Sequence, residues 1–188
     1  MYQEKRIAVI IAAAGSGTRM GSGISKQFIR IGDEMVLEKT LRVFERHPLV
    51  DDIYLVVRKE DMEFCRDALL AKARLVKLRA VISGGRERQE SVYHGLRAME
   101  KLRERWPADL ILVHDGARPF LPPDALTRLV KAAGEHHAAA LAVPVKDTIK
   151  LGGDGWVRET LDRSTLFAVQ TPQGFSREIL LAKGEFSP

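Results

Sequence analysis

The most chemically informative segment is a glycine-containing loop after the first apolar run of the chain. Residues 12–21 read Ala-Ala-Ala-Gly-Ser-Gly-Thr-Arg-Met-Gly, and small residues let backbone N–H groups approach a phosphate closely. The loop is not a Walker P-loop, because the chain has no Gly-x-x-x-x-Gly-Lys-Ser/Thr string, and Met20 breaks a dinucleotide-binding fingerprint that starts at Gly15. Instead it carries Arg19, followed seven residues later by Lys26, and two cations suit a triphosphate. We expect triphosphate binding here; the alternative is a turn with two solvated charges.

A second polar cluster follows the apolar run 110–113. It contains His114, Asp115 and Arg118. Mg²⁺ prefers one or two carboxylates together with phosphate oxygens, so Asp115 is a candidate magnesium ligand. The alternatives are that Asp115 caps a turn and that His114 packs in the core.

Two further connections carry residues that could bind a ligand. Gly84 and Gly85, with Ser91 a few positions later, could shape a base pocket from backbone and hydroxyl groups. Thr148 ends the polar stretch after another apolar run, and Arg163 lies beyond it. Each of these connections is also what an ordinary exposed loop contains, so they are weaker signals than the first loop.

The elements that must position these residues alternate along the chain. Mostly apolar runs at 7–13, 53–57, 79–82, 110–113 and 139–145 predict strands that are covered on both faces. Apolar residues at helical spacing lie between the strands, over 37–44, 92–102 and 126–133. This pattern predicts an α/β fold with a mostly parallel, doubly wound (Rossmann-like) sheet, whose ligands bind beyond the carboxyl ends of the strands.

One segment interrupts the alternation. Two short β-prone stretches, 148–151 and 156–160, flank the glycine-rich turn 152–155 and predict a β-hairpin. Its few apolar residues cannot bury much by themselves. We therefore expect an arm at about 148–163 that projects from the sheet and packs on a partner subunit.

The composition of the chain limits the classes of protein to which it can belong. The chain has 188 residues, a formal net charge of +5, 45% hydrophobic and 29% charged residues, which predicts one globular domain over 1–188. Its single cysteine, Cys65, excludes an intrachain disulfide and a cysteine-rich zinc site, and lies in a helical pattern that favours packing. The first apolar run is too short to cross a bilayer, and the basic residues are scattered among acids. We expect a soluble cytoplasmic protein that binds neither membrane nor nucleic acid.

Together these motifs resemble one family in their order and spacing. They are Ala-Ala-Ala-Gly-x-Gly-x-Arg-Met at 12–20, Lys26-Gln27, Gly84-Gly85 with Arg88 and Ser91, His114-Asp115-Gly-Ala-Arg118-Pro119, and Pro144-Val-Lys-Asp147-Thr148. The family is that of 2-C-methyl-D-erythritol 4-phosphate cytidylyltransferases, which use CTP in the non-mevalonate isoprenoid pathway. The resemblance implies cytidylyl transfer from CTP to methylerythritol 4-phosphate, with Mg²⁺ as cofactor.

The resemblance also implies roles for individual residues. Arg19 and Lys26 would bind the triphosphate and stabilise the transition state. The nucleotide would be held by Ala13, Ala14, Gly15, Gly17, Gly84, Gly85 and Ser91. The methylerythritol phosphate would face Asp115, Arg118 and Thr148, together with Arg163 from the arm of a partner in a homodimer.

The sequence departs from the family pattern at one point, and two alternative functions stay open. The family continues past this point into a final strand whose lysine contacts phosphate, and this sequence ends at Pro188, so that lysine has no counterpart to assign. A cytidylyltransferase for a pentitol phosphate such as ribitol 5-phosphate would share the CTP loop. A nucleotide-binding module without turnover is the second alternative, against which the presence of both Arg19 and Lys26 argues.

Overall fold

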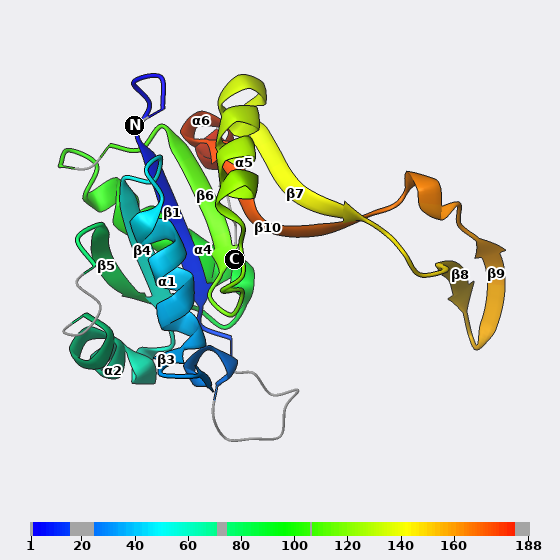
Figure 1. The fold of residues 1–188 in the computed structure, drawn as a ribbon, viewed down its shortest axis with the longest axis horizontal. Coiled ribbons are helices and arrows are strands. Elements are labelled where there is room, and N and C mark those ends of the chain that lie inside the picture. The colour runs from blue at the N-terminus through cyan, green and yellow to red at the C-terminus, as the bar shows by residue number, and fades with distance from the viewer. Residues whose placement is uncertain (1, 16–24, 71–74, 106, 183–188) are drawn as a thin grey trace.

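A six-stranded sheet forms the centre of the computed structural model, which describes residues 2–15, 25–70, 75–105 and 107–182 (Figure 1). The strand order is β5-β4-β1-β6-β10-β7. The bounds of these strands are β1 Ile7–Ala13, β4 Asp52–Val57, β5 Leu78–Ser83, β6 Leu110–Asp115, β7 Ala138–Pro144 and β10 Phe167–Ser176.

Four of the strands pair in parallel, as the alternating pattern predicts. β1 pairs with β4 on one side and β6 on the other, so Val9 lies opposite both Ile53 and Leu112. β4 continues the parallel pairing to β5. The predicted α/β fold with a mostly parallel sheet is therefore confirmed.

β10 departs from the pattern expected from the sequence. It runs antiparallel to both β6 and β7, and no strand was predicted over its residues. Thr171-Pro172 stands in the middle of this strand, and a proline ordinarily marks the end of a strand because it cannot donate to the ladder. The pairing with β7 shifts register between Val169 and Gln173, which accommodates this interruption.

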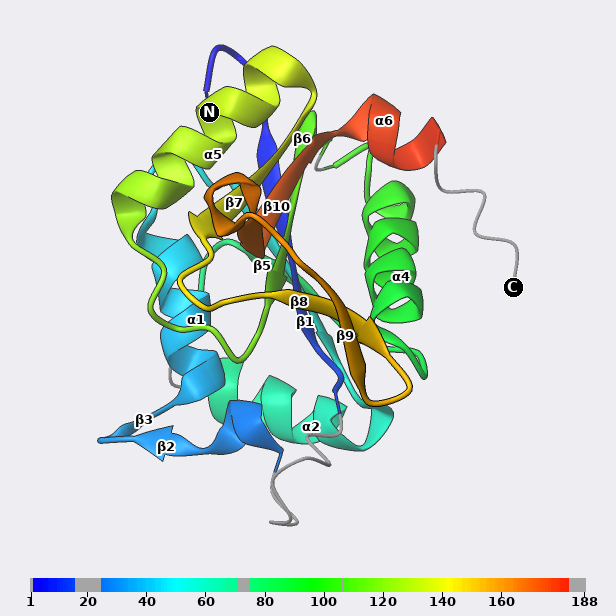
Figure 2. The ribbon, with the colours of Figure 1, turned by 90° about the vertical axis from the view of Figure 1, so that its right-hand side faces the viewer.

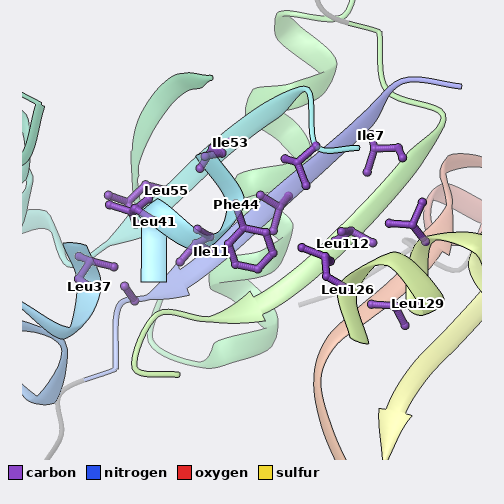
Figure 3. Close-up of a cluster of buried hydrophobic side chains, with 14 of the residues drawn as sticks. Ile7, Ile11, Leu37, Leu41, Phe44, Ile53, Leu55, Leu112, Leu126 and Leu129 are labelled. Atoms are coloured by element: carbon purple, nitrogen blue, oxygen red, sulfur yellow. The ribbon is translucent and has the colours of Figure 1, made fainter. Parts of the chain in front are cut away.

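Helices cover both faces of the sheet. α1 (Val36–Arg46) and α5 (Pro123–His136) lie on one face, and α4 (Arg88–Lys101) and α6 (Arg177–Ala182) lie on the other (Figure 2). Alternate side chains of β1 enter the two cores, because successive residues of a strand point to opposite faces. Ile7 and Ile11 join the α1 and α5 side (Figure 3), as does Val9, and Ala8 and Ile10 join the α4 side.

The short elements lie mostly in the connections. They are the β2–β3 pair (Arg30–Ile31 and Glu34–Met35), the helical turns η2 Lys26–Phe28, η3 Lys59–Asp61 and η5 Arg163–Thr165, α2 Met62–Phe64 and η4 Cys65–Leu70. Cys65 is buried, as its helical pattern predicted, and burial raises its pKa to about 12. Such a thiol packs and is not a ready nucleophile.

The predicted hairpin is present. β8 (Lys150–Gly153) and β9 (Trp156–Thr160) form a separate antiparallel pair. Figure 1 shows β7 and β10 leaving the body of the molecule together and carrying this hairpin away from it. Gly155 closes its turn with φ of +82°, a conformation that glycine adopts without strain. Among the described helices, none is long and apolar enough to cross a membrane.

Candidate functional site

A cavity of about 300 Å³ opens at the carboxyl ends of β1 and β6, where the fold predicts a ligand. The loop that leads from β5 into α4 forms another wall. The predicted site residues that line it are Ala13, Ala14, Gly15, Lys26, Gly85, Ser91 and Asp115. Residues from four separate segments of the sequence thus meet in one place.

Close backbone packing shapes the wall formed by the glycine pair. A Cβ atom on Gly84 would lie 2.4 Å from Cβ of Ala14 and 2.8 Å from Oγ of Ser91, so only glycine fits there. The N–H of Gly85 donates a hydrogen bond to Oγ of Ser91 at 3.2 Å, and Ser91 is buried. The Gly-Gly pair and Ser91 therefore act as one unit that lies against the end of β1.

Gln27 fixes the position of Lys26. Its Nε2 donates to the backbone carbonyl of Ala13 at 2.8 Å, and the Gln27 side chain is buried. Lys26 begins the helical turn η2 next to this anchor and lines the cavity. The sequence motif contained Gln27, but the contact across 14 positions could not be read from it.

The carboxylate of Asp115 is held by two arginines. Nε of Arg88 donates to Oδ1 at 3.0 Å, and Nε of Arg118 donates to Oδ2 at 3.0 Å. The backbone N–H of Asp115 donates to Oγ1 of Thr171 at 3.3 Å. The three charged side chains together carry a net charge of +1 and are partly exposed, so they favour an anion at this edge of the cavity.

His114 takes the packing role that the sequence left open. It is 1% exposed, and its ring lies edge-to-face against Phe44 with centroids 4.9 Å apart. Its Nε2 lies 3.0 Å from the backbone carbonyl of Arg118, which can only accept, so the proton is on Nε2. Burial lowers the pKa of His114 to about 4, and the neutral ring serves the core.

A magnesium ion fits this donor set only together with substrate. The described residues hold no group of three or more His, Cys, Asp or Glu side chains placed for a metal. Asp115 and Glu87 are the carboxylates among the described residues that line the cavity. Each Asp115 oxygen accepts one guanidinium N–H, which leaves a lone pair on each for a metal ion or for its bound water. One such carboxylate with triphosphate oxygens and water satisfies what Mg²⁺ requires.

Arg118 borders a second, larger cavity of about 580 Å³. Its Nη1 donates to Oε1 of Gln170, which lies with Thr171 on β10. The rest of the lining is mostly apolar, with Phe120 and Val143 among the exposed side chains. Arg118 thus joins Asp115, which lines the first cavity, to the second cavity.

The other predicted site residues to account for are Gly17, Arg19, Thr148 and Arg163. Gly17 and Arg19 fall outside the described residues. Thr148 is exposed between β7 and β8, and Arg163 is exposed in η5, where its Nη1 donates to the carbonyl of Lys146 at 3.1 Å. Both belong to the arm and line neither cavity among the described residues, so their roles stay predictions.

Comparison with known proteins gives consistent matches. The family model of 2-C-methyl-D-erythritol 4-phosphate cytidylyltransferase (IspD) matches residues 7–185. The protein of that name from Geobacter metallireducens is 44% identical over 179 residues, which are 95% of this chain and 76% of the relative. The one from Syntrophotalea carbinolica is 43% identical and covers 90% of this chain and 71% of the relative. The solved structure of 4-diphosphocytidyl-2C-methyl-D-erythritol synthase from Anaerococcus prevotii superimposes with a TM-score of 0.79 at 33% identity, over 98% of this chain and 78% of that one.

Proposed function

This chain belongs to the 2-C-methyl-D-erythritol 4-phosphate cytidylyltransferase family, and we propose that it performs the family's reaction in the cavity at the ends of β1 and β6. It is an enzyme of isoprenoid biosynthesis that transfers a cytidylyl group from CTP to 2-C-methyl-D-erythritol 4-phosphate. The observation that carries the proposed location is the meeting of Lys26, Gly85, Ser91 and Asp115 around one cavity.

The chemistry needs cations more than it needs a base. The attacking phosphate of methylerythritol 4-phosphate is already ionised at neutral pH. One of its oxygens forms a bond to the α-phosphorus of CTP while the bond to pyrophosphate breaks. The barrier comes from bringing anions together and from the charge that grows on the phosphoryl oxygens, so positioned cations lower it. We assign this role to Lys26, which lines the cavity, and to Arg19.

Mg²⁺ is the proposed cofactor. When bound with CTP it neutralises triphosphate charge, and Asp115 is the residue proposed to hold it or its water. The nucleotide is assigned to the glycine-lined wall, which we define as Ala13, Ala14, Gly15, Gly17, Gly84, Gly85 and Ser91. The close fit of Gly84 against Ala14 supports this assignment, because it packs the glycine pair against the end of β1, and Ala14 and Gly85 line the cavity.

The acceptor substrate is assigned to Asp115, Arg118 and Thr148. Arg118 supports this assignment because it extends from the Asp115 cluster to the second cavity. Thr148 and Arg163 lie on the arm, so a homodimer in which the arm of one subunit reaches the other would bring Arg163 to this cluster. Exposed apolar side chains of the arm, such as Trp156 at 79%, favour such a partner surface.

Subunit complementation tests the shared site. Arg163→Ala and Lys26→Ala chains are each expected to have low activity alone. In mixed dimers one site contains neither substitution if Arg163 acts across the interface, so a fraction of activity should return. Mixed dimers that form and stay inactive would contradict a shared site.

Pyrophosphate release tests the substrate and the cofactor. We expect release with CTP and methylerythritol 4-phosphate in the presence of Mg²⁺, and its loss when EDTA removes the metal. Ribitol 5-phosphate is the control acceptor, and a preference for it would move the assignment to a pentitol phosphate. We place the reaction in the cytoplasm, where CTP is available and Cys65 stays reduced.

A further inference from the structure

Arg88 makes a contact that the proposed reaction leaves without a purpose. It is the first residue of α4, and its Nε donates to Oδ1 of Asp115 at 3.0 Å. Oδ2 of the same carboxylate accepts from Nε of Arg118 at 3.0 Å. Each oxygen of Asp115 therefore has its own guanidinium partner, and the carboxylate is fixed at two points.

The two arginines constrain Asp115 in different ways. Arg118 lies three positions after Asp115 and ties the carboxylate to its own loop and, through Gln170, to β10. Arg88 lies 27 positions before Asp115, and it lines both the cavity at the ends of β1 and β6 and a neighbouring cavity with Val113 and Phe175. Arg88 is thus the contact that holds Asp115 in register with the glycine-lined wall at the start of α4.

Removing Arg88 would change the behaviour of Arg118 as well. A guanidinium that faces a carboxylate alone favours a bidentate pair, with one N–H to each oxygen. Arg118 now uses Nε for Asp115 and Nη1 for Gln170. Once Oδ1 no longer accepts from Arg88, Arg118 can donate from two nitrogens to the Asp115 carboxylate. It then loses its hydrogen bond to Gln170 and moves away from the second cavity.

We propose that Arg88 is a positioning residue for the acceptor substrate, acting through Asp115. It keeps the Asp115 carboxylate aimed for the acceptor's hydroxyl groups and keeps Arg118 extended toward the acceptor's phosphate. This inference rests on the proposed function, which assigns Asp115 and Arg118 to that substrate. Because the role depends on one N–H at a fixed place, the point charge of a lysine does not replace it.

Steady-state kinetics on Arg88→Gln and Arg88→Lys test the proposal, with CTP and methylerythritol 4-phosphate varied separately. We expect the KM for methylerythritol 4-phosphate to rise about tenfold or more and kcat to fall, since misplaced groups lose orientation. The KM for CTP should change less than about twofold, because Arg88 is paired with Asp115 and the residues assigned to CTP are unchanged. Arg97→Gln is the matched control, since Arg97 is an exposed arginine of the same helix.

A double-mutant cycle identifies the route of the effect. If Arg88 acts through Asp115, Arg88→Gln should add nothing to the loss already caused by Asp115→Asn. If the losses in kcat/KM caused by Arg88→Gln and Asp115→Asn add up in the double variant, the proposal is overturned. A KM for CTP that rises in Arg88→Gln and returns to normal in Arg88→Lys would also overturn it, because that result indicates direct binding of the triphosphate. Normal kinetics in Arg88→Gln overturns this inference alone, whereas an inactive unsubstituted chain overturns the proposed function and this inference with it.

Discussion

Nε2 of Gln27 donates a 2.8 Å hydrogen bond to the carbonyl oxygen of Ala13, and this buried contact ties the start of η2 to the end of β1. Replacing Gln27 with glutamate keeps the shape and turns the donor into an acceptor that faces the carbonyl. We expect kcat/KM to fall at least tenfold as Lys26 moves from its place. The unfolding free energy should drop by about 1–3 kcal/mol, because a buried polar pair is broken.

Kinetics and thermal melting check this expectation together. Gln89→Glu, the same chemical change at an exposed position of α4, is the control. Equal kinetics in the two variants would show that the Gln27 contact does not position Lys26.

Lys26 should be needed for turnover rather than for folding. Replacing it with alanine removes a cation at the charge that develops during transfer, and we expect kcat to fall by about a hundredfold or more at saturating CTP and Mg²⁺. Arg19→Ala should lower kcat to a similar extent. Lys26→Arg should keep part of the activity, since the charge remains. Near-normal kcat in Lys26→Ala, measured by pyrophosphate release, would refute the assigned role.

The sequence predicts the buried strands β1, β4 and β6 closely because strands covered on both faces must be apolar, whereas the equally apolar run 139–145 forms β7, most of whose residues are exposed. The run 7–13 coincides with β1, and the run 110–113 gives all of β6 except its last two residues. Those two, His114 and Asp115, are polar, so the apolar pattern ends before the strand does. β10 could not be recognised because Thr171-Pro172 divides it and its direction depends on pairing with distant strands.

The sequence predicts which segments of the chain form the candidate site. Lys26, Gly85, Ser91 and Asp115 each follow or flank a predicted strand, and parallel pairing brings those ends together. The contact between Arg88 and Asp115 is different, because it depends on how two long side chains pack across 27 positions. Such a contact can be identified only from the three-dimensional structure, because the spacing of the two residues along the chain does not predict it.

Gly84 should tolerate no side chain. A Cβ atom there would lie 2.4 Å from Cβ of Ala14, a distance that forces the wall of the cavity to shift. We expect Gly84→Ala to lower the unfolding free energy by about 1–3 kcal/mol through overpacking and to raise the KM for CTP. Calorimetric melting and kinetics measure the two effects. Gly153→Ala is the control, because its Cβ would meet the Arg158 side chain at an ordinary 3.5 Å; equal behaviour of the two variants would contradict the close fit.

Acid should destabilise the fold partly through His114. Burial lowers the pKa of this residue from 6.5 to about 4, so the unfolded chain binds its proton first as the pH falls. The contribution of His114 to stability is complete above pH 6.5 and is lost progressively between pH 6.5 and about 4, by on the order of 3 kcal/mol. His114→Gln keeps a donor for the carbonyl of Arg118 and does not titrate.

Denaturant unfolding of both proteins between pH 4 and 7 measures the difference. The variant should lose less stability over this range than the unsubstituted chain. Some loss should remain in the variant, because burial also lowers the pKa of His47. Parallel pH profiles would exclude His114 as a source of acid sensitivity.

Two neighbouring buried polar groups on β4 should respond in opposite ways to removal. The carboxylate of Asp52 is fully buried and accepts from Nε and Nη2 of Arg6 at 2.6 and 2.9 Å, as well as from Nε of Arg79. Asp52→Asn leaves two guanidinium groups without their anion and should lower the unfolding free energy by about 3 kcal/mol.

The hydroxyl of Tyr54 is buried with no hydrogen-bond partner among the described residues, and burial raises its pKa to about 12. Tyr54→Phe removes an unsatisfied group while keeping the ring, so stability should stay equal or rise by up to about 1 kcal/mol. Urea unfolding of the two variants tests both statements, and a Tyr54→Phe protein as unstable as Asp52→Asn would mean that the hydroxyl has a partner in solution.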